Sequence, residues 1–256
     1  MEDKNKKQEV NKTMIKLTAR DIGLLKLKDF CPRCFWFRIK YPIENAHTFR
    51  FPMPGIVSIM DSYIKQLISQ YFRQNRTLPD WFQDALRESG FINPTEIKYI
   101  SPSKRWKVKI ETYELTGIPD ALFQMEDDSF LIADYKTASF TSAQEELFPL
   151  YEAQLNAYKY LAEHENLKVK ALSLIYMEPI RYKDDIDYLL KISKEKLTLH
   201  FRCMTKFVKI WGNREVEELV KEAGKILSSA SPPEGNPECK YCKGFNEWLN
   251  NLIDLI

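Results

Sequence analysis

The sequence contains little that would place it in a membrane-spanning, exported or strongly basic class of protein. No apolar run reaches the roughly 18 residues that a membrane helix needs, and residues 1–13 are mostly polar and charged, so we expect no signal peptide. Lys and Arg number 38 against 36 Asp and Glu, which leaves a net charge of only +2 at pH 7. A bulk positive field toward nucleic acid is therefore excluded, and any basic surface must be local. The sequence predicts a cytoplasmic protein with no membrane partner.

The 256 residues are enough for one large domain with a sizeable core. Composition and the expected elements divide the chain into four parts. They are a flexible tail at 1–13, an N-terminal helical region at 14–100, a core at 101–192, and a C-terminal helical region with a cysteine pair at 193–256.

The segment 117–136 carries the clearest pattern in the chain. Two short apolar runs flank an acidic turn, which predicts a β-hairpin. Residues i and i+2 of a strand point to the same face, so Asp134 and Lys136 are expected to project together. If the hairpin closes across residues 125–129, Asp120 comes alongside Asp134. Two carboxylates and one ammonium group would then meet at one end of a sheet.

Such a group suits the hydrolysis of a phosphodiester. The carboxylates of Asp120 and Asp134 can hold a hard divalent cation such as Mg²⁺ or Mn²⁺, and the backbone carbonyl of Tyr135 can add a ligand. Lys136 can orient the attacking water, help to deprotonate it, or stabilise charge in the transition state. The alternative is an exposed hairpin with a surface salt bridge, because Asp-x-Lys is a common pattern.

The order of three motifs resembles the PD-(D/E)XK nuclease superfamily, and within it the RecB-like group with its AddB-type and CRISPR-associated exonucleases. The motifs are Pro119-Asp120, then Asp134-Tyr135-Lys136, then Gln154-x-x-x-Tyr158. Gln154 and Tyr158 are four residues apart and lie on one face of a helix. In the RecB-like group this helix follows the core strands and faces the active site and the DNA.

The resemblance implies an α/β fold with a restriction-endonuclease-like core, a mixed central sheet flanked by helices. It also implies a metal-dependent exonuclease that acts on single-stranded DNA ends, in DNA repair or in CRISPR-type processing with protein partners. Asp120 and Asp134 would bind Mg²⁺ or Mn²⁺, and Lys136 would be catalytic. Gln154 and Tyr158 would position the substrate.

One expected ligand is missing from the helix that we predict from Gly55 to about Arg73. In the RecB-like pattern a His one helical turn beyond this Gly binds the metal, whereas this sequence has Ile59. Asp61 is the candidate replacement, and the alternative is that it is a solvated acid. The missing His also leaves open a catalytically inactive DNA-binding or scaffold protein on a nuclease fold.

Two Cys-x-x-Cys pairs stand near opposite ends of the chain, Cys31 with Cys34 and Cys239 with Cys242. Without an export signal, metal binding is favoured over disulfides. Four thiolates fit either tetrahedral zinc or a 4Fe–4S cluster. RecB-like relatives place cluster cysteines in these regions, which favours 4Fe–4S. They usually have one early and three late, however, so the two-plus-two arrangement keeps zinc open. Either centre would join the two terminal helical regions, and four unrelated buried thiols are the remaining alternative.

The remaining pattern predicts the elements around the hairpin. Thr18 is expected to cap a first helix, and residues 79–89 to form a short one. Residues 105–116 alternate as one half-buried strand, whose basic neighbours can contact a phosphate backbone or solvent; these are Lys104, Arg105, Lys107 and Lys109. Later expected elements are a loop at 137–146, a helix at 148–163, a parallel strand at 168–177, a strand at 185–192, a helix at 193–211 containing Cys203 as a core residue, and helices at 214–229 and 245–256.

Overall fold

The computed structural model describes residues 14–41, 55–90, 92–180, 200–244 and 246. Its centre is a five-stranded sheet in the order β2-β5-β6-β7-β8. The strands are β2 (Ile97–Ser101), β5 (Ala121–Met125), β6 (Phe130–Lys136), β7 (Val169–Pro179) and β8 (Phe201–Val208). β6 and β7 are parallel, whereas the other neighbours are antiparallel, so the sheet is mixed. This confirms the predicted mixed sheet.

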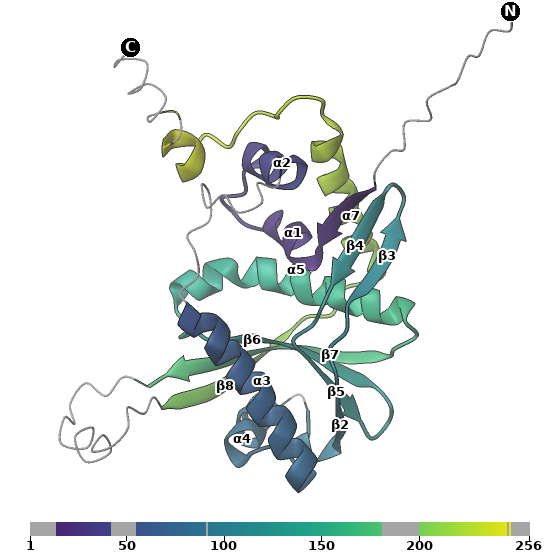
Figure 1. The fold of residues 1–256 in the computed structure, drawn as a ribbon, viewed down its shortest axis with the longest axis vertical. Coiled ribbons are helices and arrows are strands. Elements are labelled where there is room, and N and C mark those ends of the chain that lie inside the picture. The colour runs from purple at the N-terminus through teal and green to yellow at the C-terminus, as the bar shows by residue number, and fades with distance from the viewer. Residues whose placement is uncertain (1–13, 42–54, 91, 181–199, 245, 247–256) are drawn as a thin grey trace, which may run out of the picture.

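Helices cover both faces of this sheet (Figure 1). α5 (Ser142–His164) connects β6 to β7 and lies along one face. α3 (Gly55–Asn75) and α4 (Asp80–Glu88) lie on the other face, and a short 3₁₀ helix, η2 (Pro94–Glu96), leads into β2. A parallel pair of strands needs a crossover connection, and α5 provides it.

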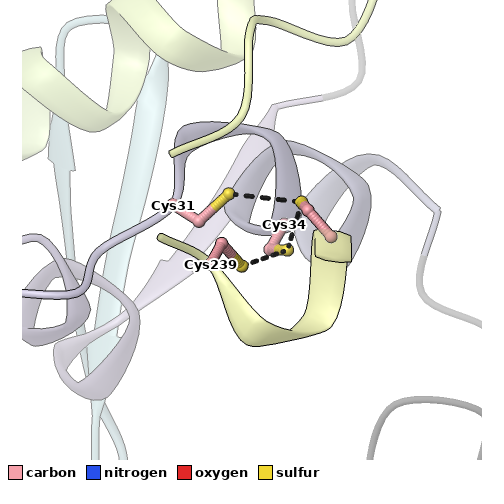
Figure 2. A group of neighbouring side chains, drawn as sticks. Cys31, Cys34 and Cys239 are labelled. Atoms are coloured by element: carbon pink, nitrogen blue, oxygen red, sulfur yellow. Dashed lines mark hydrogen bonds between the residues drawn. The ribbon is translucent and has the colours of Figure 1, made fainter. Parts of the chain in front are cut away.

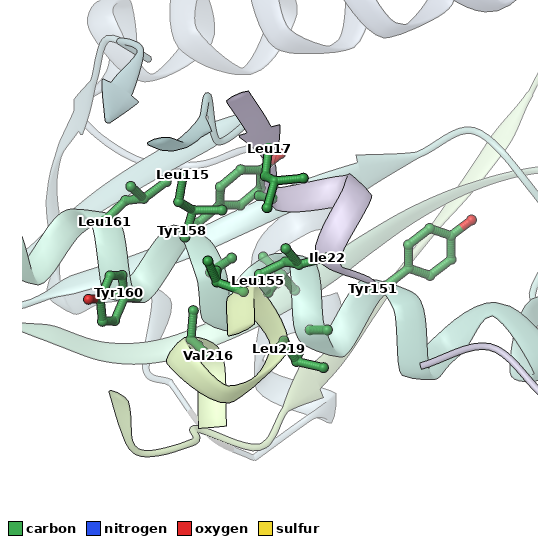
Figure 3. Close-up of a cluster of buried hydrophobic side chains, with 14 of the residues drawn as sticks. Leu17, Ile22, Leu115, Tyr151, Leu155, Tyr158, Tyr160, Leu161, Val216 and Leu219 are labelled. Carbon is green, nitrogen blue, oxygen red and sulfur yellow. The ribbon is translucent and has the colours of Figure 1, made fainter. Parts of the chain in front are cut away.

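A smaller sheet and three helices lie beyond α5. The sheet has the order β1-β4-β3, formed by β1 (Ile15–Thr18), β3 (Trp106–Ile110) and β4 (Tyr113–Gly117). The helices are α1 (Ala19–Leu24), α2 (Pro32–Lys40) and α7 (Asn213–Ser228). Apolar side chains from these elements pack on α5 in one buried cluster (Figure 3), which includes Leu17, Ile22, Leu115, Leu155, Val216 and Leu219. α5 is therefore covered on both sides.

Several predicted elements are confirmed. β5 and β6 form the hairpin within 117–136, with Ala121 opposite Ala133, and β7 returns parallel to β6. Thr18 caps α1 in a capping box with Asp21. α7 matches the helix expected over 214–229. In the described part of the chain, no helix is both long and apolar enough to cross a membrane.

The single strand expected over 105–116 is wrong. The chain turns at Glu111, which adopts a positive φ of 55°, and two strands, β3 and β4, pair with each other. They join the smaller sheet and not the sheet that contains the β5–β6 hairpin. The predicted alternation of buried and exposed residues is confirmed within 106–110, since Trp106 and Ile110 are buried and Lys107 and Lys109 are exposed.

The helix expected over 193–211 is also wrong where the structure describes it. Residues 201–208 form β8, which pairs with β7 along eight residues. Cys203 is thus a strand residue, and burial raises the pKa of its thiol to about 12. The loop expected over 137–146 is shorter, because α5 begins at Ser142. The strand at 185–192 and, apart from 246, the helix at 245–256 lie outside the described residues.

Candidate active site and cysteine cluster

Asp134 and Lys136 project from the end of β6 toward α5. The ammonium group of Lys136 forms an ion pair with Asp134 Oδ2. Gln154 on α5 donates a hydrogen bond from Nε2 to Asp134 Oδ1 at 3.3 Å and another to the hydroxyl of Tyr158 at 2.8 Å. Asp134 is only 4% exposed, so its charge depends on these partners. Tyr135 packs on the opposite face of the sheet.

Asp120 lies between β4 and β5, where the chain leaves the smaller sheet. Its Oδ2 accepts the backbone N–H of Tyr135 at 3.0 Å, which holds it against the strand that carries Asp134. Burial raises the pKa of the Asp120 carboxyl, the charge of Asp134 raises it further, and Lys65 only partly offsets this. The carboxylates of Asp120 and Asp134 are therefore close enough for the charge of Asp134 to act on Asp120.

Lys65 of α3 is a site residue that the sequence analysis missed. Its Nζ lies 2.7 Å from Asp120 Oδ1 and 2.7 Å from Asp61 Oδ2. Burial alone would lower the pKa of Lys65, but the two carboxylates outweigh burial and raise it, so the ammonium group stays charged. Asp61 is thus connected to Asp120 through Lys65. The spacing of Asp61 and Lys65, four residues apart on a predicted helix, was the available signal.

Two tyrosines complete the surroundings of Lys136, and neither was singled out from the sequence. Its Nζ lies 4.1 Å from the ring centroid of Tyr151 on α5, a cation–π contact. Tyr176 of β7 stands opposite Lys136, and burial, with smaller effects of Tyr151 and Asp134, raises the pKa of its hydroxyl. Tyr151 lies one helical turn before Gln154, so the helical pattern could have identified it, whereas Tyr176 follows from sheet register alone.

The donor atoms at this site fit a hard divalent cation. Asp120 and Asp134 offer carboxylate oxygens, which Mg²⁺ and Mn²⁺ prefer. The Oε1 atom of Gln154 is buried and has no hydrogen-bond partner among the described residues. A positive charge is already stabilised here, because the ammonium group of Lys65 lies between two carboxylates. The site therefore combines carboxylate charge with one amide oxygen, Gln154 Oε1, that lacks a hydrogen-bond partner.

Comparison with known proteins identifies the family. The family model described as the PD-(D/E)XK nuclease superfamily matches residues 52–244, which is most of the chain and contains every residue of this site. The chain belongs to this superfamily. No curated protein matches it. A solved structure described as "Crystal structure of SSO0001" is similar at 13% identity and a TM-score of 0.49, covering 89% of this chain and 82% of that one. A likeness at that level carries no argument here.

The basic residues of the segment 104–109 in this PD-(D/E)XK protein lie on β3 of the smaller sheet and just before it. Lys107 and Lys109 are exposed on β3, and Lys104 pairs with Glu165 at 2.6 Å. β3 pairs with β4, and β4 leads directly to Asp120. The basic strand is therefore connected to the site through the chain, although it is not part of the five-stranded sheet.

The four cysteines of the two Cys-x-x-Cys pairs come together in one group (Figure 2). Cys31 and Cys34 stand at the start of α2, and Cys239 and Cys242 follow α7 in the chain. Cys31 and Cys239 are buried, and the other two are partly buried. Burial alone would raise the pKa of Cys31, but hydrogen bonds from the backbone of Cys34 and Asn236 lower it to about 7. The fold thus gathers four thiols from opposite ends of the chain.

A close contact beneath Tyr158 gives a prediction about stability. A Cβ atom on Gly117 would lie 2.6 Å from Tyr158 Cε1 and 3.1 Å from Leu161 Cδ1. Gly117→Ala is therefore expected to lower the free energy of unfolding by about 1–3 kcal/mol, because α5 must move to admit the methyl group. Urea unfolding measures this. Gly55→Ala is the control, since a Cβ atom there meets nothing within 4 Å, and an equal effect in both variants would contradict the prediction.

Proposed function

We propose that this PD-(D/E)XK protein is a metal-dependent deoxyribonuclease, and that Asp120, Asp134 and Lys136 form its catalytic site. The observation that supports this most strongly is the convergence of the three residues from the β5–β6 hairpin. Asp134 and Lys136 form an ion pair on one face of β6, and Asp120 is hydrogen-bonded to the residue between them. The order of the three sequence motifs, on which the resemblance to PD-(D/E)XK nucleases rests, supports the same assignment.

Each residue has a role that its surroundings support. Asp120 and Asp134, with the backbone carbonyl of Tyr135, would hold Mg²⁺ or Mn²⁺, which lowers the pKa of bound water and stabilises charge on the phosphate. Lys136 would orient the attacking water and neutralise developing negative charge, and its contact with Tyr151 keeps the ammonium group in place. Asp61 would add a carboxylate oxygen to the metal once its ion pair with Lys65 is broken.

Gln154 and Tyr158 would position the substrate strand. Gln154 already donates to Asp134, and burial, then the charge of Asp134, raises the pKa of the Tyr158 hydroxyl, which keeps it neutral. A neutral hydroxyl and an amide can donate to phosphate oxygens without repelling them. The sequence resemblance to the RecB-like group supports single-stranded DNA ends as the substrate, in repair or in CRISPR-type processing.

One observation favours a second candidate, a DNA-binding or scaffold protein without catalysis. Ile59 stands where RecB-like enzymes have a metal-binding His, and the ammonium group of Lys65 lies between Asp61 and Asp120. A cation supplied by the chain would compete with a divalent ion for Asp120. Cleavage therefore requires that the divalent ion outcompetes this ammonium group.

A cleavage assay distinguishes the two candidates. Purified protein is incubated with end-labelled linear single-stranded DNA and with a circle of the same sequence, in Mn²⁺, in Mg²⁺ and in a chelator. The nuclease proposal expects metal-dependent loss of the linear strand and persistence of the circle. Cleavage of both the linear strand and the circle would indicate an endonuclease and not an exonuclease. Binding of DNA without cleavage in any metal would favour the scaffold.

A further inference from the structure

The resemblance to RecB-like nucleases favours an iron–sulfur cluster at the four cysteines, but the spacing of the sulfur atoms does not fit one. The Sγ atom of Cys34 lies 3.6 Å from those of Cys239 and Cys242, and the Sγ atoms of Cys31 and Cys242 are also 3.6 Å apart. All four sulfur atoms lie within 4.8 Å of one another (Figure 2). Disulfides would need about 2.05 Å between sulfur atoms, and all four cysteines are free.

These spacings can be compared with the two candidate centres. Four thiolates around one tetrahedral zinc ion, at Zn–S of about 2.3 Å, lie about 3.8 Å from one another. In a 4Fe–4S cluster each cysteine binds a different iron atom at a corner of the cube, which holds the sulfur atoms roughly 6 Å apart. Three sulfur pairs, at 3.6 Å, are close to the spacing around a single ion, and none of the four sulfur atoms is as far from another as a cluster requires. To hold a cluster, the sulfur atoms of the two cysteine pairs would have to move apart by more than the length of a covalent bond.

Contacts between the segments that carry the cysteines oppose such a movement. Gly235 packs against both segments, since a Cβ atom on it would lie 3.3 Å from Cys242 Sγ and 3.6 Å from Arg33 Nε. Arg33, between the first two cysteines, donates from Nε to the carbonyl of Pro233 at 3.1 Å. Asn236 donates from its side chain to the carbonyl of Phe30 at 3.0 Å. These contacts tie the two cysteine segments together at their present separation.

The hydrogen bonds to sulfur are also those of a thiolate–metal centre. The backbone N–H of Asn236 donates to Cys31 Sγ at 3.4 Å. The turn that holds Asn236 in place is closed by the N–H of Cys239, which donates to the carbonyl of Asn236 at 2.9 Å. An N–H group that donates to a ligand's sulfur atom orients that ligand and stabilises its negative charge. One short turn thus supplies a ligand and a donor to the opposite pair.

We propose that Cys31, Cys34, Cys239 and Cys242 bind a single structural zinc ion instead of an iron–sulfur cluster. The ion joins α2 to the segment after α7, which are more than 200 residues apart in the chain. The same two regions also meet where Trp36 Nε1 donates to the carbonyl of Ser229 at 3.1 Å. Zinc itself has no redox chemistry in proteins, so the centre stabilises the fold and carries no electrons.

The metal content of the native protein tests this proposal independently of nuclease activity. The protein is produced with iron and zinc both supplied and is purified without oxygen, so that a labile cluster would survive. Elemental analysis is expected to find about one zinc ion per chain, in a colourless protein. A brown protein with about four iron atoms per chain would overturn the proposal, and so would protein that carries no metal at all.

Cobalt substitution and two cysteine variants complete the test. Co²⁺ added to metal-stripped protein is expected to give the intense visible bands of tetrahedral thiolate coordination, which zinc then removes. Cys239→Ser should lose these bands, whereas Cys203→Ser should keep them, because Cys203 lies in β8 away from the group. Bands that survive in Cys239→Ser, or that indicate octahedral coordination, would contradict a four-sulfur site. The native metal content decides the question even if Cys239→Ser fails to fold.

Discussion

Lys136→Met is expected to reduce DNA cleavage in Mn²⁺ by a factor of about 10²–10³, the loss typical of removing one group that stabilises transition-state charge. Met keeps the length and apolar stem of the side chain but has no ammonium group. The ion pair with Asp134 and the contact with the ring of Tyr151 are both lost. Single-turnover cleavage of end-labelled DNA measures the effect, because it isolates the chemical step from product release.

Two controls separate a catalytic effect from a structural one. Lys206→Met removes a lysine that also lies over an aromatic ring, 3.9 Å from the centroid of Phe140, and that forms no ion pair with Asp120 or Asp134 in the described part of the chain. It should cleave at the rate of the unmodified protein. Since Asp134 is buried, removing Lys136 also leaves a charge with fewer partners, so thermal unfolding is followed with and without Mn²⁺. Cleavage by Lys136→Met at the unmodified rate would remove Lys136 from the proposed site.

The β5–β6 hairpin could be predicted because the sequence pattern that specifies it lies within one short segment. The apolar runs on either side of residues 125–129 and the parallel return at 168–177 set the positions of β5, β6 and β7. β8 could not be predicted in the same way. Phe201, Met204 and Val208 recur at spacings that suit a helix, and the strand forms because β7 offers it a partner along its whole length. Pairing between distant segments here outweighs the local pattern.

The parts of the site that sequence reasoning missed depend on contacts between distant segments. Lys65 reaches Asp120 across 55 residues, and Tyr176 is placed opposite Lys136 by the register of β6 and β7. Neither contact has a motif of its own. The cysteine spacing likewise predicted four metal ligands, but the separation of their sulfur atoms depends on how α2 meets the end of the chain. That separation is what distinguishes one ion from a cluster.

Asp120→Asn is expected to abolish the stabilisation of the protein by Mn²⁺, together with DNA cleavage. A ligand at 100 times its dissociation constant stabilises a folded protein by about 2.7 kcal/mol, which is readily seen as a higher melting temperature. Asn keeps the shape of the side chain and can still accept the N–H of Tyr135, but it has lost the charge that holds a hard cation. Melting temperatures measured at increasing Mn²⁺ report the change directly.

The same substitution should leave the metal-free protein more stable at neutral pH. Burial and the charge of Asp134 raise the pKa of Asp120, so the folded protein favours the neutral form. The resulting stabilisation is fully present below the pKa of the unfolded state and is lost as the pH rises through the higher folded pKa. Asn stays neutral throughout, so its advantage over Asp should grow as the pH rises from the unfolded to the folded pKa, and vanish on acidification below the unfolded pKa. For the unmodified protein, Mn²⁺ binding should be lost on acidification at a higher pH than an ordinary Asp would allow.

Two further variants make the result specific to the site. Asp128→Asn changes an exposed acid that also pairs with a lysine, Lys98, at a positive φ of 60° that Asn tolerates; it should leave the Mn²⁺ response unchanged. Lys65→Met should tighten Mn²⁺ binding, because Asp120 no longer shares its charge with an ammonium group. If Asp120→Asn kept the full Mn²⁺ response, or Lys65→Met weakened it, the divalent ion would have to bind elsewhere, and Lys65 would not be its competitor.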